Sequence, residues 1–78
     1  MTGDHSSPMR VVRIRAEPIE LSRLLKLADV TDSGGEAKQI INDGLVAVNG
    51  EVETRKGRKL RVGDRVVYGK ETFVVEIG

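Results

Sequence analysis

The amino-acid sequence predicts an α+β fold in which two short adjacent helices pack on a small antiparallel β-sheet. Apolar residues alternate with polar ones near both ends of the chain, which is the pattern of half-buried strands. Between about residues 20 and 43 the apolar spacing becomes helical, and an Asn-Gly pair then marks a hairpin. With 78 residues, the chain is long enough for one domain. We expect that domain to span residues 9–78, after a polar, disordered tail at residues 1–8.

The first predicted element is a strand over residues 9–16. Val12 and Ile14 point to one side of this strand, and the residues between and around them point to the other. Pro18 interrupts the alternation, so we expect the strand to end before it. The strand therefore buries two aliphatic side chains and exposes its arginines.

A helix follows over about residues 20–29. At ~100° per residue, its apolar side chains fall on one arc. These side chains are Leu21, Leu24, Leu25 and Ala28. Arg23 and Lys26 fall on the opposite side, one turn apart, and are expected to face solvent.

A second helix begins at a capping box, in which Ser33 caps the helix and Glu36 returns a hydrogen bond. One face of this helix carries Ala37, Ile40 and Ile41. Gly44 supplies the left-handed residue that ends the helix. Because both helices are short and closely connected, we expect them to share one core.

The next predicted element is a hairpin around the Asn-Gly pair. A three-residue loop over 48–50 pairs Val46 with Val52 and gathers the valines on one face. A two-residue loop instead puts the valines on the same face as Glu51 and Glu53. Because a shift of one residue turns every side chain over, burial favours the three-residue loop.

A last hairpin is expected from residues 65–68 and 72–77. Its second strand alternates, with Phe73, Val75 and Ile77 pointing inward. This hairpin completes the sheet, and its inward residues complete an aliphatic core.

The net charge is only +1, but the charges are segregated along the chain. Residues 9–26 carry a net charge of +3, residues 27–53 carry −5, and residues 54–70 carry +6. The last segment contains four bases in the five residues from Arg55 to Lys59, with no acid inside the run. Because such bases repel one another, we expect an external anion such as a nucleic-acid phosphate to compensate them. The alternative is a set of unrelated solvated charges.

The composition argues against several other classes of protein. The chain has no cysteine, and its one histidine, His5, lies in the expected tail. We therefore expect no enzyme activity, no bound metal and no cofactor. No apolar run approaches the ~18 residues of a membrane span, and no apolar signal segment opens the chain. We expect a cytoplasmic monomer that contacts no membrane and takes no small-molecule substrate.

The order of these elements resembles a known RNA-binding domain. The matching residues are Leu24–Leu27, Ser33–Lys38, Ile41, Gly44–Glu51 and Val62–Asp64. They are similar to the αL-motif domain named after small-subunit ribosomal protein S-four, whose two adjacent helices form its RNA surface. Residues 53–60 resemble more narrowly the stand-alone bacterial members of this family. The resemblance implies non-catalytic binding of structured RNA, such as a ribosomal or tRNA-like stem-loop, including RNA within the ribosome.

The same resemblance implies an RNA-binding surface on the two helices, and the charge of the basic run adds that segment to the expected site. Its candidate residues are Arg23, Lys26, Gly34, Gly35, Lys38, Arg55, Lys56, Arg58, Lys59 and Arg61. Having no side chains, the two glycines would let a phosphate approach unpaired N–H groups at the start of the second helix. Lys38 would add a contact beside them. We expect Lys38 and the basic run to share one positive surface.

Structural alternatives stand beside these expectations. The glycines would also suit a tight helix crossing, and Arg23, Lys26 and Lys38 would also suit a solvated surface. The whole molecule could serve as a protein-interaction module that docks on a ribosomal or replication partner.

Tyr68 and Phe73 are the only aromatic residues, and both are expected in the core, so no aromatic platform is available for stacking unpaired bases. We therefore expect recognition of backbone shape with low base specificity.

Overall fold

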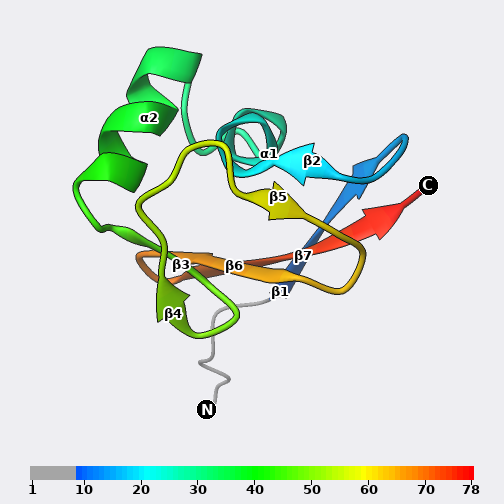
Figure 1. Cartoon of the computed structure of the whole chain (residues 1–78). Coiled ribbons are helices and arrows are strands. Elements are labelled where there is room, and N and C mark those ends of the chain that lie inside the picture. Colours follow the sequence, from blue (N-terminus) through cyan, green and yellow to red (C-terminus); the bar gives the residue numbers. More distant parts are fainter. Residues whose placement is uncertain (1–8) are drawn as a thin grey trace, which may run out of the picture.

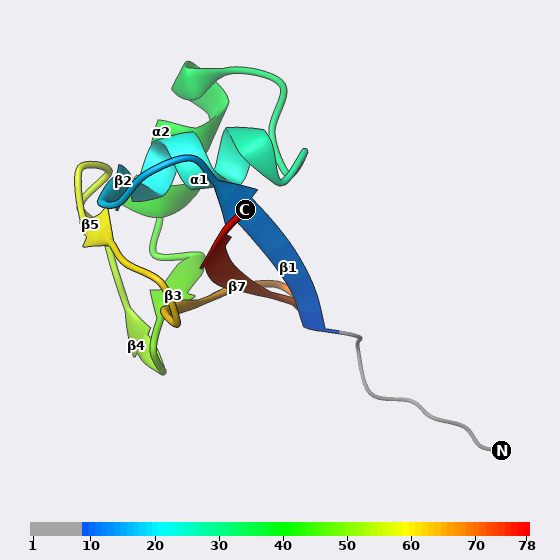
Figure 2. The same cartoon turned by 90° about the vertical axis from the view of Figure 1, so that its right-hand side faces the viewer.

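The computed structural model describes residues 9–78, in which two helices lie on one side of a five-stranded sheet (Figures 1 and 2). The expected tail at residues 1–8 lies outside the described residues. In chain order the elements are β1 (Met9–Ile14), β2 (Ile19–Glu20), α1 (Leu21–Leu27), α2 (Gly34–Asn42), β3 (Val46–Val48), β4 (Glu51–Val52), β5 (Lys59–Leu60), β6 (Arg65–Tyr68) and β7 (Glu71–Ile77). The predicted α+β class is confirmed.

The main sheet has the strand order β1-β7-β6-β3-β4. Three of its pairs are antiparallel, and β1 lies parallel to β7 with Val12 opposite Val75. The first and last strands of the chain are therefore neighbours (Figure 2). The short strands β2 and β5 form a separate antiparallel pair beside α1 (Figure 1). This second pair holds the segment after β4 on the helical side of the molecule.

The core lies between the helices and the main sheet, and it is almost entirely aliphatic. Its fully buried side chains include Leu21, Leu24 and Leu25 from α1, Ala37 and Ile41 from α2, and Val46, Val48, Leu60, Val66, Phe73 and Val75 from the strands. Val12 and Ile14 are buried as the alternation predicted. The prediction for Ile77 is wrong, because this side chain is 52% exposed. The pairing of β7 with β6 ends at Val74, so Ile77 lies in a part of β7 that pairs with β1 alone.

The start of α2 follows the expected capping in part, and its end follows it fully. The Ser33 hydroxyl accepts a hydrogen bond from the Glu36 backbone N–H at 3.2 Å. The Glu36 carboxylate accepts from the N–H of Asp32 at 2.8 Å, one residue before the partner that a capping box predicts. At the other end Gly44 adopts a φ of 76°, and the N–H groups of Gly44 and Leu45 bond back to the last turn. The helix is therefore fixed at both termini.

The predicted register of the β3–β4 hairpin is wrong. The structure pairs Ala47 with Val52 across a two-residue loop, Asn49-Gly50. The φ values of these two loop residues are 52° and 89°, as a type I′ turn requires. Val52 is 67% exposed as a result.

The reason for this register lies in Glu53. The two-residue loop places Glu53 on the same side as the buried valines, which the burial argument treated as unfavourable. Glu53 is nevertheless buried, at 7% exposure, because two arginines pair with its carboxylate. A buried carboxylate that is paired and hydrogen-bonded avoids most of the cost of an isolated buried charge.

Candidate functional site

The basic loop, residues 55–59, is attached to the start of α1 by the backbone. The N–H of Leu21 donates to the carbonyl of Arg58 at 2.9 Å, and the N–H of Ser22 donates to that of Lys56 at 3.1 Å. The first N–H groups of a helix have no partner within the helix, and the Glu20 side chain forms no cap. The loop therefore supplies the cap of α1 through its own carbonyl groups. This cap fixes where the basic side chains leave the backbone.

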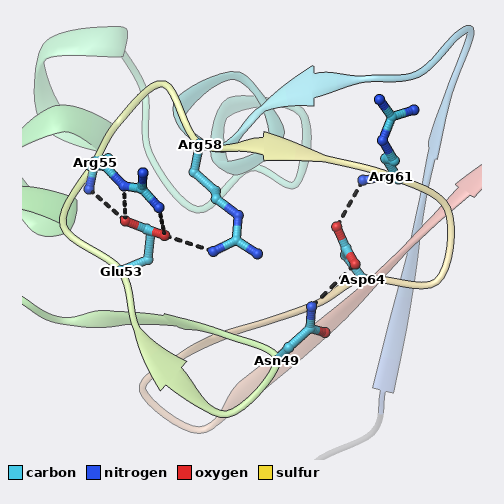
Figure 3. A network of polar contacts seen from close by, with 6 residues as sticks. All are labelled: Asn49, Glu53, Arg55, Arg58, Arg61 and Asp64. Atoms are coloured by element: carbon cyan, nitrogen blue, oxygen red, sulfur yellow. Dashed lines mark hydrogen bonds and ion pairs between the residues drawn. The ribbon is translucent and has the colours of Figure 1, made fainter.

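Glu53 organises the side chains of the same loop (Figure 3). Its Oε2 accepts from the N–H and the Nε of Arg55, both at 3.0 Å. Its Oε1 accepts from Nη2 of Arg55 at 3.2 Å and from Nη1 of Arg58 at 2.8 Å. Hydrogen bonds from the Arg55 side chain, then from the Arg58 side chain and the Arg55 backbone, lower the pKa of Glu53 from 4.5 to about 2. The carboxylate therefore stays charged over the physiological range.

This network corrects one step of the sequence argument. No acid lies inside the run Arg55–Lys59, but Glu53 precedes it by two residues and pairs with Arg55 and Arg58. Lys59 pairs with Glu20 of β2 at 3.4 Å. Arg55, Arg58 and Lys59 therefore have carboxylate partners, whereas Lys56 has none among the described residues. Because Glu53 and Glu20 supply two negative charges for these three bases, part of the positive charge of the run also stays uncompensated.

A groove runs between α2 and the basic loop, with a volume of about 660 Å³. Gly35, Lys38, Gln39 and Asn42 line it from α2, and Thr54, Arg55, Lys56 and Gly57 line it from the other side. We call this feature the lysine groove. It brings together segments that are separated by the whole β3–β4 hairpin (Figure 1).

Lys38 and Lys56 meet across the lysine groove. Close contact with the Lys56 side chain, and then charge repulsion from it, lowers the pKa of Lys38. Within residues 9–78 neither lysine forms an ion pair, whereas four other basic side chains do. Two adjacent ammonium groups repel each other, and an anion placed between them would remove that repulsion.

The two glycines at the start of α2 are not required by packing. A Cβ atom on Gly34 would meet nothing within 4 Å, and one on Gly35 would meet only the Ser33 hydroxyl at 3.9 Å. The alternative of a tight helix crossing is therefore wrong. Their N–H groups form no hydrogen bond with another described residue. The first turn of α2 is open to a ligand in front of these donors.

The other predicted site residues lie outside the lysine groove, and three of them share a second depression. Gly34, Arg23 and Lys26 line a smaller depression of about 340 Å³ on the α1 side, which also includes Glu20. Arg61 lines neither of these places. Figure 3 shows its side chain well away from Glu53, and among residues 9–78 its one hydrogen bond to a side chain is from its backbone N–H to Asp64. Arg58 points at Glu53 rather than into the lysine groove.

The sequence argument missed four residues that line the groove, Gln39, Asn42, Thr54 and Gly57, and it also missed Glu53. Asn42 and Gln39 lie one turn from Lys38 and Gly35, so helical spacing could have identified them. Thr54 carries no such signal, because its position depends on the course of the chain after β4. Glu53 could have been recognised only by accepting a buried carboxylate in the hairpin.

No group of three or more His, Cys, Asp or Glu side chains in residues 9–78 is arranged to hold a metal ion. In the same part of the chain, neither helix has the length and apolar character needed to cross a membrane.

Comparisons with known proteins agree on one family. A family model described as "S4 domain" matches residues 12–76. The "Probable ribosome maturation protein RlbA" of Bacillus subtilis (strain 168) is 51% identical over 65 residues, which cover 82% of this chain and 92% of that protein. The "Putative RNA-binding protein YbcJ" of Escherichia coli (strain K12) is 46% identical over 57 residues, which cover 73% of this chain and 81% of that protein.

A solved structure is similar over the whole chain. It is the solution structure of YbcJ from E. coli, described as revealing an αL motif involved in RNA binding. The TM-score is 0.63 at 31% sequence identity, and the match covers 100% of this chain and 96% of that chain.

Proposed function

The chain belongs to the S4-domain family, and on that basis we propose that it binds structured RNA through the lysine groove, without catalysing a reaction. Two relatives support RNA as the ligand, because YbcJ is named and described as RNA-binding and RlbA is named as a ribosome maturation protein. We propose a ribosomal or tRNA-like stem-loop as the target, bound in the cytoplasm by a monomer.

The observation that carries the proposal is the placement of Lys38 beside Lys56. Two unpaired cations at one point of the surface form a site for a single phosphate group. The open first turn of α2 adds the partial positive charge of a helix N-terminus next to this point. Each of these features attracts anions, and all of them border one groove.

Such a site fixes the position of the RNA backbone. Phosphate contacts set register and orientation without reading the base sequence. Every phosphate that a lysine neutralises also releases counterions, so the binding constant falls as salt is added. We therefore propose that affinity depends steeply on ionic strength.

The test is fluorescence anisotropy with a labelled ribosomal RNA hairpin over a series of salt concentrations. We expect Lys38→Ala and Lys56→Ala each to weaken binding, and the two substitutions together to reduce the steepness of log K against log salt by about 0.7 to 0.9, the value for the single phosphate that the two lysines share. Lys70→Ala, which removes an exposed lysine from the β6–β7 turn, is the matched control and should leave the slope near that of the wild type. The proposal fails if the three variants behave alike. Absence of RNA binding even at low salt would favour the alternative, a protein-interaction module.

A further inference from the structure

Arg55 differs from the other bases around the lysine groove because its guanidinium is held in place. Two of its nitrogens, Nε and Nη2, donate to the two oxygens of Glu53 at 3.0 and 3.2 Å. A paired contact of this kind keeps the carboxylate close to the plane of the guanidinium and uses only one edge of the group. The side chain is still 75% exposed. Its flat faces are therefore fixed in orientation and not covered by Glu53.

A fixed, exposed guanidinium plane is a stacking surface for a nucleobase. Unpaired RNA bases stack either on aromatic rings or on arginine planes. Phe73 is fully buried and Tyr68 is packed against the core, so neither ring can serve this role. Arg55, which lines the lysine groove, therefore offers a flat surface there on which a base can stack.

The rest of the groove suits the other parts of a nucleotide. Its volume of about 660 Å³ lies within the range of roughly 300–1,000 Å³ that small-molecule sites occupy. Lys38 and Lys56 offer two cations to a phosphate. Asn42 and Thr54 add polar groups that form no side-chain hydrogen bond with another described residue, whereas the Gln39 amide already donates to Asp43.

We infer that the lysine groove takes one unpaired nucleotide of the RNA, with its base stacked on the guanidinium of Arg55 and its phosphate between Lys38 and Lys56. This inference rests on the proposed function and names the RNA feature that the same site recognises. It also revises the expectation from the sequence, where the lack of exposed aromatic residues left no platform for unpaired bases.

Glu53 is a positioning residue in this arrangement. It contacts no RNA, but it fixes the plane on which the base stacks. Coulomb's law alone predicts that removing this negative charge strengthens the binding of an anion. Positioning predicts the opposite for a bulged RNA, because a freely rotating guanidinium must be ordered again when the base binds.

The experiment compares three RNA duplexes of the same sequence. One is fully paired, one carries a single bulged nucleotide, and one carries an abasic nucleotide in the bulge. The abasic duplex keeps the bent backbone and its phosphates but has no base to stack. We expect the wild-type protein to bind the bulged duplex at least about fivefold more tightly than the abasic one, the lower end of what stacking on one base contributes.

Arg55→Lys tests the stacking surface, because it keeps the charge and removes the plane. We expect its affinities for the bulged and abasic duplexes to become equal, while the salt dependence on the paired duplex stays close to that of the wild type. Arg61→Lys is the matched control, since this arginine lies away from the groove, and it should keep the preference.

A second pair of variants tests the positioning role. Glu53→Gln and Glu51→Gln make the same change of charge on neighbouring positions, but Glu51 is exposed and forms no side-chain hydrogen bond with another described residue. We expect only Glu53→Gln to lose the preference for the bulged duplex, with thermal melts establishing that each variant is folded. If Glu53→Gln does not fold, the Arg55 pair decides the matter.

The outcomes separate the inference from the proposed function. Equal wild-type affinity for the bulged and abasic duplexes overturns the inference and leaves phosphate binding intact. A preference that survives Arg55→Lys overturns the assignment of the base to Arg55. Failure to bind any of the three duplexes at low salt overturns the proposed function itself.

Discussion

Replacing the glycines at the start of α2 by alanine should stabilise the protein. Gly34 has no atom within 4 Å of an added Cβ, and Gly35 has only the Ser33 hydroxyl at 3.9 Å, which is an ordinary contact. Neither glycine has a left-handed φ, so the backbone already suits an alanine. Alanine is favoured over glycine in a helix by up to about 1 kcal/mol, and we expect about 0.5 kcal/mol at these first two positions.

A gain of 0.5 to 1 kcal/mol corresponds to a rise in Tm of roughly 2 to 8 °C in a domain of this size. Thermal unfolding followed by circular dichroism measures it directly. Gly63→Ala is the contrasting control, because Gly63 has a φ of 93° and the same chemical change should lower the Tm there. A fall in Tm for Gly34→Ala would refute the finding that the first turn of α2 is open. Gly35→Ala should also weaken RNA binding, since Gly35 lines the lysine groove and a methyl group there would hinder the approach of a phosphate.

Three further predictions follow from other parts of the structure. The pKa of Glu53 is about 2 in the folded protein against an ordinary value of 4.5, so the unfolded state binds more protons between these values. The stability that Glu53 contributes should therefore be fully present above about pH 4.5 and be lost as the pH falls toward 2, and an acid titration of Glu53→Gln should lack that part of the fall. Asp29 ends α1 with a φ of 61°, so Asp29→Gly should raise the Tm in the same unfolding assay, and an unchanged or lower Tm would contradict the strained cap. Val52→Thr should change the unfolding free energy by less than about 0.5 kcal/mol, whereas Val48→Thr should cost more than about 1 kcal/mol; equal costs in urea titrations would contradict the two-residue loop.

Most of the fold could be predicted from periodicity and end signals. The apolar arc of α1, the Ser33 cap and the stop at Gly44 are local features, and each is present in the structure. The pairing of β1 with β7 could not be predicted in this way, because the two strands lie at opposite ends of the chain. No local pattern indicates which strand closes a sheet over that separation.

The hairpin register shows where a burial rule fails. The rule kept carboxylates out of the core and so selected the longer loop. Glu53 is buried because Arg55 and Arg58 return over it, and their positions depend on the loop that caps α1. That contact combines three segments, so it cannot be read from any one of them.

The candidate site was predicted in part for the same reason. Lys38 and Lys56 were both expected on one positive surface, and the structure brings them to one groove. Arg61 and Arg58 were expected with them on charge alone, and neither lines that groove. Composition identifies which bases are present, whereas backbone contacts of the basic loop decide which of them meet α2.

The most direct test of the RNA-binding account is to locate the bound RNA by NMR. Titrating the ¹⁵N-labelled protein with a ribosomal RNA stem-loop should shift the amide signals of Gly35, Lys38, Asn42 and residues 54–57, and leave the exposed side of β1 and β7 unaffected. Shifts confined to that side of the sheet, around Val11 and Val74, would contradict the account.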